Sequence, residues 1–467
     1  MRDVSVRRGA YVDSVTLMQV SRRVSGLDGV QAAIVAMATD LNVDLARGMG
    51  FDVPAASPND MLVAVEADSR AALDASAAEV DAALSAPAPL AGFGNPPPPV
   101  TVRAAAARSD ATVAIVSTPG RFAFADAVDA VDAGLHVMVF SDNVPLAQEV
   151  RLKEYAATAG VLVMGPDCGT AVIGGVGLGF ANVVRPGPVG VVAASGTGAQ
   201  HLMCLLDGVD VGVSHCLGVG GRDLSAAVGG RSTLRALDLL DEDPSTSLIV
   251  VLSKPPDSSV AAAVQAHAST LRTPVLFGLL GDGQPGLTTT AATVTAAVGG
   301  TWSAPEHWPG AVAGGRAGGH LRGLFVGGTL RDEAAVVLGR VTGAGHTLLD
   351  LGDDRFTAGR PHPMIDGSDR LGRLRAAVED PTTGVLLVDV VLGLGAEDDP
   401  AGRLARAVRD ATSAGVPVVA TVVGTRDDPQ GLRAQVAELC DAGAWVFLSN
   451  AAAARCALGL LDVGSVS

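Results

Sequence analysis

The strongest constraint on the fold is a regular alternation of short apolar runs with amphipathic stretches, from about residue 111 to about residue 447. The runs are rich in Val, Ile and Leu, and helix-forming stretches separate them. Continuous β-branched runs between helices are typical of parallel sheets covered by helices on both faces. The runs occupy 111–116, 136–140, 161–164, 189–193, 248–252, 274–277, 323–326, 385–388, 416–420 and 445–447.

Two segments without this periodicity divide the chain. Residues 85–106 include four consecutive prolines and predict an extended linker, and residues 299–319 predict a second, glycine-rich linker. We predict a small α+β module for assembly or regulation at 1–84, a Rossmann-like domain at 107–186, and flavodoxin-like domains at 187–298 and 320–467. The predicted fold class is α/β, with tandem doubly wound parallel-sheet domains behind the small N-terminal α+β module.

Composition narrows the classes of partner. The 467 residues carry a formal net charge of -16, so nucleic acid, itself a polyanion, is not an expected partner. No apolar run is long enough to span a membrane, and the first residues lack the pattern of a leader, so we expect a cytoplasmic location. Five cysteines without Cys-x-x-Cys spacing indicate neither a disulfide framework nor a metal site.

The clearest binding motif follows the run at 189–193. Ser195, Gly196, Thr197 and Gly198 stand between this predicted strand and a helix. Glycines let an anion approach the backbone, hydroxyls add donors, and a helix N-terminus offers free N–H groups with about half a positive charge. The motif predicts a phosphate site. The alternative is a plain strand–helix turn in which Ser195 caps the helix.

Two further glycine turns follow predicted strands. Gly393 and Gly395 come after the run at 385–388 and would supply a second helix N-terminus to the same phosphate, or form an ordinary turn. Gly220 and Gly221 precede Arg222, a side chain suited to a carboxylate or carbamoyl group or to a solvated ion pair.

Single side chains at other turns add candidates for chemistry. Lys254 is one of only two lysines and precedes two prolines after a predicted strand, where it is either functional or an incidental surface residue. Cys168 also follows a predicted strand, as a substrate contact or, more simply, a packed thiol. Arg360 and His362 lie in a proline-held loop that predicts either a ligand contact or an inter-domain contact.

These motifs together resemble a known superfamily. Residues 107–300 resemble the α subunit of succinyl-CoA synthetase, through Met164-Gly-Pro-Asp-Cys-Gly169 and Gly190-Val-Val-Ala-Ala-Ser-Gly-Thr197. Residues 320–460 resemble the carboxyl-terminal domain of its β subunit. Over nearly the whole chain, the order of motifs is similar to that of the FdrA family. The segments that carry this second resemblance are 11–18, 140–145, 220–224, 253–256 and 359–366.

The chain also departs from CoA ligases of that superfamily. Such ligases hold CoA on an N-terminal glycine loop and relay phosphate through a histidine in a Gly-His-Ala-Gly segment. Here the first 100 residues contain no such loop, and the segment at 280–289 contains no histidine. The nucleotide-binding grasp domain has no counterpart in this sequence either.

The FdrA resemblance implies a subunit of an oxamate carbamoyltransferase, which interconverts oxalurate plus phosphate with oxamate plus carbamoyl phosphate in ureide catabolism. On this hypothesis the turns at 195–198 and 393–395 bind phosphate, Arg222, Lys254 and His362 act on the substrate, and Cys168, Gly220, Gly221 and Arg360 help to bind it. No cofactor or metal is expected. Companion protein subunits and an oligomeric assembly are expected.

Two other functions stay open. The chain is alternatively an acyl-CoA or succinyl-CoA ligase α-type subunit that uses CoA and borrows missing sites from a partner. The third hypothesis is a non-catalytic scaffold, in which the glycine turns are merely structural.

Overall fold

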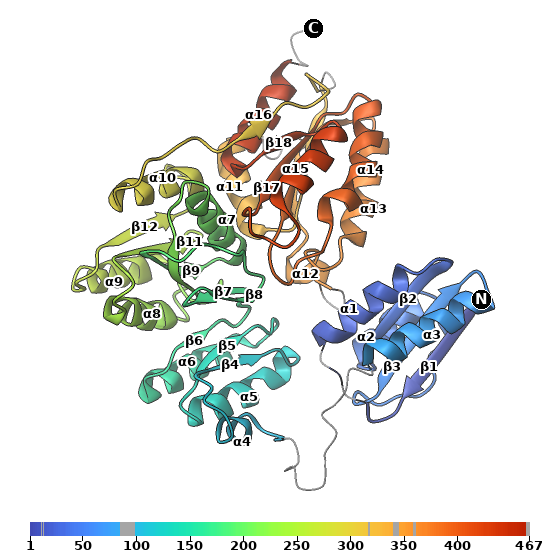
Figure 1. Cartoon of the computed structure of the whole chain (residues 1–467), viewed down its shortest axis with the longest axis horizontal. Coiled ribbons are helices and arrows are strands. Elements are labelled where there is room, and N and C mark those ends of the chain that lie inside the picture. Colours follow the sequence, from blue (N-terminus) through green and yellow to red (C-terminus); the bar gives the residue numbers. More distant parts are fainter. Residues whose placement is uncertain are drawn as a thin grey trace. The chain divides into compact units, whose positions relative to one another are not determined.

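The chain folds as two compact units in the computed structural model, which describes all residues except 11, 13, 85–98, 316–317, 340–344, 358–360 and 464–467 (Figure 1). One unit comprises Met1–Ala105 with Thr357–Pro361, and the other comprises Ala106–Phe356 with His362–Ser467. The predicted α/β class and the small N-terminal module are confirmed. Within the described residues, no helix has the length and apolarity to cross a membrane.

The first unit is an antiparallel three-stranded sheet with helices on it, in the strand order β1-β3-β2. Alternate residues of the central strand enter two different cores: Val63 packs with helix residues such as Leu17, whereas Leu62 packs with Phe51. Both faces are therefore covered. The elements are β1 (Arg2–Arg7), α1 (Ser14–Ser25), β2 (Val30–Met37), α2 (Asp40–Gly48), β3 (Met61–Ala67), α3 (Arg70–Leu84) and α4 (Val102–Ala106).

The second unit begins with a small parallel sheet of the order β4-β5-β6, as the alternation from residue 111 predicts. Its elements are β4 (Val113–Val116), α5 (Gly120–Asp132), β5 (His136–Val139), α6 (Leu146–Ala159) and β6 (Val163–Met164).

A six-stranded sheet follows, in the order β12-β11-β9-β10-β7-β8. β9 to β12 are parallel, while β7 and β8 form an antiparallel hairpin on β10, so residues 170–179 pair in this sheet rather than in the preceding one. The elements are β7 (Thr170–Ile173), β8 (Val176–Gly179), β9 (Val189–Ala194), α7 (Gly196–Asp207), β10 (Val213–Gly218), α8 (Arg231–Glu242), β11 (Leu248–Ser253), α9 (Ser258–Ala268), β12 (Val275–Leu279) and α10 (Leu287–Ala297).

The last sheet has the order β13-β18-β17-β16-β14-β15 and is parallel except at β13. Every residue of β16 is buried, as its apolar run at 385–388 indicates, and this includes the carboxylate of Asp389. The elements are β13 (His307–Trp308), β14 (His320–Phe325), α11 (Gly328–Leu338), β15 (Thr347–Asp350), α12 (Asp354–Thr357), α13 (Ser368–Glu379), β16 (Thr383–Val391), α14 (Pro400–Ser413), β17 (Val418–Val423), α15 (Leu432–Asp441), β18 (Trp445–Phe447) and α16 (Asn450–Val463).

Two helices from different sheets meet in the second unit. α7 follows β9 of the first six-stranded sheet, α11 follows β14 of the other, and the two helices pack against each other (Figure 1). Ligands of parallel sheets bind beyond the carboxyl ends of the strands, where such helices begin. The start of α7 and the start of α11 are therefore the places to look for a site.

Candidate functional site

The N-termini of α7 and α11 are joined by their own first-turn hydroxyls. Ser195 is the N-cap of α7, where its Oγ accepts a hydrogen bond from the backbone N of Gly198 at 3.1 Å. The same Oγ lies 2.5 Å from Oγ1 of Thr329, in the first turn of α11. Both hydroxyls are buried. Two sets of free helix N–H groups, each carrying about half a positive charge, thus converge on one place, which suits an anion.

Glycines permit this close approach. A Cβ on Gly198 would clash with Ser195 Oγ and would lie 2.9 Å from Cγ2 of Thr329. A Cβ on Gly327, just before α11, would lie 3.0 Å from Oγ1 of Thr197. Any side chain at either position would push the helices apart. Gly196 is exposed and Thr197 is half-buried, so this end of α7 is open to a ligand.

Two cations, Lys254 and Arg331, and two carboxylates stand at the start of α11, where Arg331 Nη1 is 2.9 Å from Oδ1 of Asp332. Lys254 follows β11, as predicted, and its Nζ is 2.8 Å from Oδ2 of Asp332. A Cβ on Gly328 would lie 3.4 Å from this Nζ and would clash with Oδ2 of Asp350, so Lys254 and Asp350 both stand beside Gly328. Burial raises the pKa of Asp350, while the Lys254 ammonium opposes that rise. Lys254 therefore adds a positive charge to the α11 end of the site, next to a carboxyl group that binds protons more readily than usual.

A buried aspartate fixes the turn into α11. The carboxylate of Asp389 accepts hydrogen bonds from the backbone N of Val326 at 2.8 Å and of Gly327 at 2.9 Å. Arg370 donates through Nη1 to the Asp389 backbone oxygen and lies 3.5 Å from its Oδ1. Burial raises the pKa of Asp389 to about 6, and the Arg370 guanidinium opposes this. Asp389, with Arg370 beside it, therefore fixes the backbone of the turn between β14 and α11.

His362 lies beside the loop that carries Asp350. Its Nε2 is 2.7 Å from the position of a Cβ on Gly352, whose backbone N donates to Asp350 Oδ1 at 3.0 Å. Nδ1 of His362 accepts from the backbone N of Met364 at 3.2 Å, and the ring is 5.6 Å from that of Phe180. Burial lowers the pKa of His362 to about 4. The imidazole is therefore neutral at pH 7 and carries its proton on Nε2.

The turn at Gly393 and Gly395 has a different role from the start of α11. Both glycines have positive φ, at +114° and +74°. Gly393 donates to Oε1 of Gln430 at 3.0 Å, and Leu394 donates to the oxygen of Ala181 at 2.8 Å. The next helix, α14, begins only at Pro400. The backbone of this turn is used to join two segments of the fold, so no helix N-terminus faces Ser195 from here.

Arg222 is an exposed residue that pairs with a buried ion network. Its Nε is 2.8 Å from Oε2 of Glu149, and Nη2 donates to the oxygen of Val144 at 2.9 Å. Lys153 lies between Glu149 at 3.0 Å and Asp223 at 2.8 Å. These bonds tie α6 to the loop after β10. Arg222 is thus placed with Glu149, not with Ser195 or Lys254.

Cys168, Gly220 and Gly221 lie at neighbouring turns. A Cβ on Gly220 would be 2.6 Å from the oxygen of Pro166, whereas Gly221 has open space around it. Cys168 donates from Sγ to the oxygen of Thr170 at 3.5 Å, and burial raises the pKa of its thiol to about 12. Such a thiol stays protonated and unreactive. Arg360 lies outside the described residues.

Thr329, Asp350 and Asp389 are site residues that the sequence reasoning did not select. The signal for Thr329 is nonetheless in the sequence: Gly328 and Thr329 follow the run at 323–326 much as Gly196 and Thr197 follow the run at 189–193. The two carboxylates stand inside or at the end of apolar runs, where a buried charge needs partners. Those partners come from distant segments.

Comparisons with known proteins place the chain in a family. Residues 1–94 match the AllF heavy metal-associated domain, and residues 324–460 match the CoA-ligase family. YahF, an uncharacterized protein of Escherichia coli (strain K12), is 35% identical over 493 aligned residues, which cover 94% of this chain and 95% of YahF. The chain belongs to the YahF family. The segment that matches the CoA-ligase family lies in its second unit.

More distant relatives match part of the chain. The succinate–CoA ligase [ADP-forming] subunit alpha 2 of Archaeoglobus fulgidus is 27% identical over 158 residues, 33% of this chain and 54% of that protein. The malate–CoA ligase subunit alpha of Methylorubrum extorquens is 27% identical over 180 residues, 36% of this chain and 60% of that protein. The dinucleotide-forming acetyl-coenzyme A synthetase 1 of Ca. Korarchaeum cryptofilum, a solved structure, covers 78% of this chain and 86% of its own at 18% identity, with a TM-score of 0.31.

The name of the N-terminal domain family raises the question of a metal. Heavy metals prefer thiolate and imidazole ligands. Residues 1–94 contain neither cysteine nor histidine. Among the residues described throughout the chain, no group of three or more His, Cys, Asp or Glu side chains is arranged to hold a metal ion. The donor set of this YahF-family domain does not fit a heavy-metal site.

Proposed function

We propose that this YahF-family chain is a subunit of an enzyme that transfers a carbamoyl group between a small amide and inorganic phosphate. The observation that carries the proposal is the contact of Ser195 with Thr329 at 2.5 Å, which brings the N-termini of α7 and α11 together. A phosphate dianion needs dispersed positive charge and many donors. Two helix starts and the Lys254 ammonium supply both.

The reaction needs no group beyond such a site. A phosphate oxygen attacks the terminal carbonyl carbon of oxalurate, and a C–O bond forms. The C–N bond to the oxamate part then breaks, and the proton of hydrogen phosphate ends on the leaving nitrogen. Carbamoyl phosphate and oxamate result, with charge and atoms balanced. Donors fixed around the phosphate stabilise the transition state without reorganising.

The residues around the site take different roles in this reaction. Ser195, Thr197 and the backbone N–H groups at the start of α7 and α11 bind the phosphate oxygens. Lys254 balances the charge at the α11 end. Asp350, whose pKa burial raises, is placed beside Lys254 and carries the proton from phosphate to nitrogen. His362, neutral and bearing its proton on Nε2, donates to the carbamoyl oxygen.

An acyl-CoA ligase subunit is the second candidate. It is favoured by the match of residues 324–460 to the CoA-ligase family and by the similarity to α subunits of succinate–CoA and malate–CoA ligases. An acyl phosphate would also fit between the two helix starts. The missing histidine at 280–289 favours direct transfer to phosphate over a phosphohistidine relay. CoA belongs to this second candidate alone, whereas companion subunits and an oligomeric assembly belong to both proposals.

The test is phosphate release from carbamoyl phosphate in the presence of oxamate, with the chain co-purified with the products of neighbouring genes. We expect oxamate-dependent release with oxalurate formed in equal amount. The variant Lys254→Gln should lose most of this activity, whereas Arg375→Gln, which removes an exposed charge from α13, should not. CoA-dependent turnover of an acyl phosphate without oxalurate would favour the ligase. Full activity in Ser195→Ala and Lys254→Gln would favour a scaffold.

A further inference from the structure

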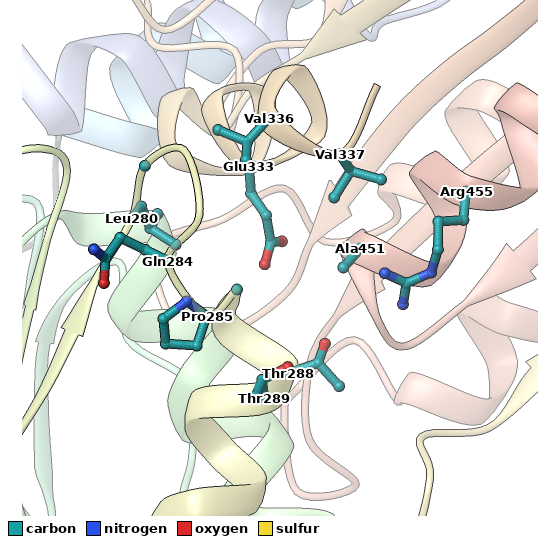
Figure 2. A pocket seen from close by; sticks show the side chains of 12 residues that line it. Leu280, Gln284, Pro285, Thr288, Thr289, Glu333, Val336, Val337, Ala451 and Arg455 are labelled. Carbon is teal, nitrogen blue, oxygen red and sulfur yellow. The ribbon is translucent and has the colours of Figure 1, made fainter. Parts of the chain in front are cut away.

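A cavity of about 230 Å³ lies in the second unit, between the loop that precedes α10, helix α11 and helix α16 (Figure 2). This is the volume of about seven or eight water molecules at roughly 30 Å³ each, enough for a small organic ligand. Its wall includes Leu280, Pro285, Thr288, Glu333, Val336 and Arg455. None of Ser195, Thr197, Lys254 or Thr329 lines it. The cavity is therefore distinct from the phosphate site.

Glu333 places a negative charge in this wall. Its Oε1 accepts from the backbone N of Leu287 at 2.7 Å, and its Oε2 accepts from Nδ2 of Asn450 at 2.8 Å. The side chain is buried, and within the described part of the chain no Lys, Arg or His nitrogen forms an ion pair with it. Each carboxylate oxygen has a second lone pair. A buried carboxylate without a cation gains most from an incoming ammonium group.

Arg455 supplies the opposite charge. It is an exposed residue of α16, and no hydrogen bond or ion pair engages its guanidinium among the residues the structure describes. Figure 2 shows the guanidinium of Arg455 and the carboxylate of Glu333 directed toward the same space from α16 and α11. A free guanidinium fork matches a carboxylate through two parallel bonds. The wall of the cavity thus offers one group that favours an ammonium and another that favours a carboxylate.

The rest of the wall is largely apolar. Leu280 and Ala451 are buried, and Val336 exposes 38% of its surface, although valine normally packs away from water. We infer that the cavity binds a small aliphatic amino acid, with its ammonium at Glu333, its carboxylate at Arg455 and its hydrocarbon part against Val336. The hydroxyl of Thr288, which is 2.7 Å from Ser449 Oγ, lies along the same wall.

This site is joined to the phosphate site by one helix. Thr329 stands in the first turn of α11, and Glu333 is four residues later on the same face. Glu333 also holds the start of α10 through Leu287. An amino acid bound at Glu333 would stabilise α11 and α10 in the arrangement that the phosphate site requires.

The test is calorimetric titration of the full chain with L-valine and two matched probes. 3-Methylbutanoate lacks the ammonium group, and 2-methylpropylamine lacks the carboxylate. We expect valine to bind at least tenfold more tightly than either probe. The variant Arg455→Gln should weaken valine binding at least tenfold while leaving phosphate affinity unchanged, and Val336→Ser should weaken it less. Arg375→Gln is the control for removal of one exposed charge.

Three results would overturn the inference. One is that neither valine nor 4-aminobutyrate, in which the two charged groups are farther apart, binds at millimolar concentration. This result is expected if Arg455 forms an ion pair with Glu333 and closes the cavity. Another is binding that is unaffected by Arg455→Gln. The third is binding that Lys254→Gln abolishes and Arg455→Gln does not, which would place the ligand at the phosphate site. Because this experiment measures valine binding and not carbamoyl transfer, a negative result would not contradict the proposed function.

Discussion

Two glycine turns of the last sheet follow buried parallel strands, yet the structure uses them differently. After β14, Gly327 and Gly328 lead at once into α11, whose N-terminus faces Ser195. After β16, the backbone of Gly393 donates to Gln430, that of Leu394 donates to Ala181, and the next helix starts at Pro400. A glycine turn becomes an anion site when a helix begins in it and a second set of donors meets that helix. Glycine spacing alone does not distinguish the two cases.

The largest effect should come from separating the two helices. In Gly198→Val the new side chain would clash with Ser195 Oγ and press on Thr329. We expect phosphate affinity to fall by about 100-fold, which corresponds to roughly 2.7 kcal/mol. Calorimetric titration with phosphate measures this. Gly221→Ala, at a position with open space, serves as the control, and equal affinity in both variants would break the comparison.

The other turn should show the opposite behaviour. An alanine at Gly393 must adopt a φ of +114°, and its Cβ would lie 2.6 Å from the oxygen of Ala181. We expect Gly393→Ala to lower the free energy of unfolding by about 2 kcal/mol, since strain of this kind costs on the order of 1 to 3 kcal/mol. Chemical denaturation measures the loss. Phosphate affinity should stay within twofold of that of the unmodified chain, and a large drop would mean that this turn also binds phosphate.

Lys254 should matter for affinity and for its salt dependence. Removing the ammonium in Lys254→Gln leaves Arg331 as the remaining cation beside Asp332 and Asp350, and phosphate then meets less positive charge. We expect about a tenfold weaker affinity, in line with the roughly 1.5 kcal/mol of a charged hydrogen bond. The affinity of the variant should also depend less on ionic strength. An unchanged affinity, matching that of Arg375→Gln, would remove Lys254 from the site.

Asp389 should give an effect on stability, rather than on phosphate affinity, that depends on pH. Its pKa is raised from 3.8 to about 6 in the folded chain, so the folded state binds this proton more tightly than the unfolded state does. The stability from this group is present below pH 4 and is lost as pH rises to about 6. Relative to Asp389→Asn, the unmodified chain should therefore lose roughly 2 to 3 kcal/mol over that interval, since the pKa rises by about two units and each unit corresponds to 1.36 kcal/mol. Denaturant titrations at pH 4 and pH 7 measure the difference. A constant difference would contradict this role of Asp389.

Much of the fold follows from the sequence alone. The β-branched runs at 189–193 and 385–388 could be assigned to buried strands because parallel strands covered on both faces leave no polar side. The hairpin at 170–179 was harder to assign, since its strands are four residues each and it pairs with β10, more than thirty residues later. Short strands take their partner from tertiary contacts that local pattern does not encode.

The site divides in the same way. Ser195 and Gly198 can be predicted from sequence because the hydrogen bond between an N-cap and the first turn of its helix is local. That Thr329 and not Gly393 meets Ser195 depends on the packing of α7 on α11, across 134 positions of sequence. Arg222 pairs with Glu149, a buried carboxylate on α6, and not with the site. The sequence of the glycine turn does not predict this partner.

The central claim is that phosphate binds between the starts of α7 and α11. The most direct measurement is the phosphate affinity of the double variant Ser195→Ala/Thr329→Val, titrated alongside Gly393→Ala. Both substitutions in the double variant remove hydroxyls from the observed contact while keeping the approximate shape of the side chains. The account predicts at least a tenfold loss of affinity in the double variant and none in Gly393→Ala. Full affinity in the double variant, with loss in Gly393→Ala, would contradict it.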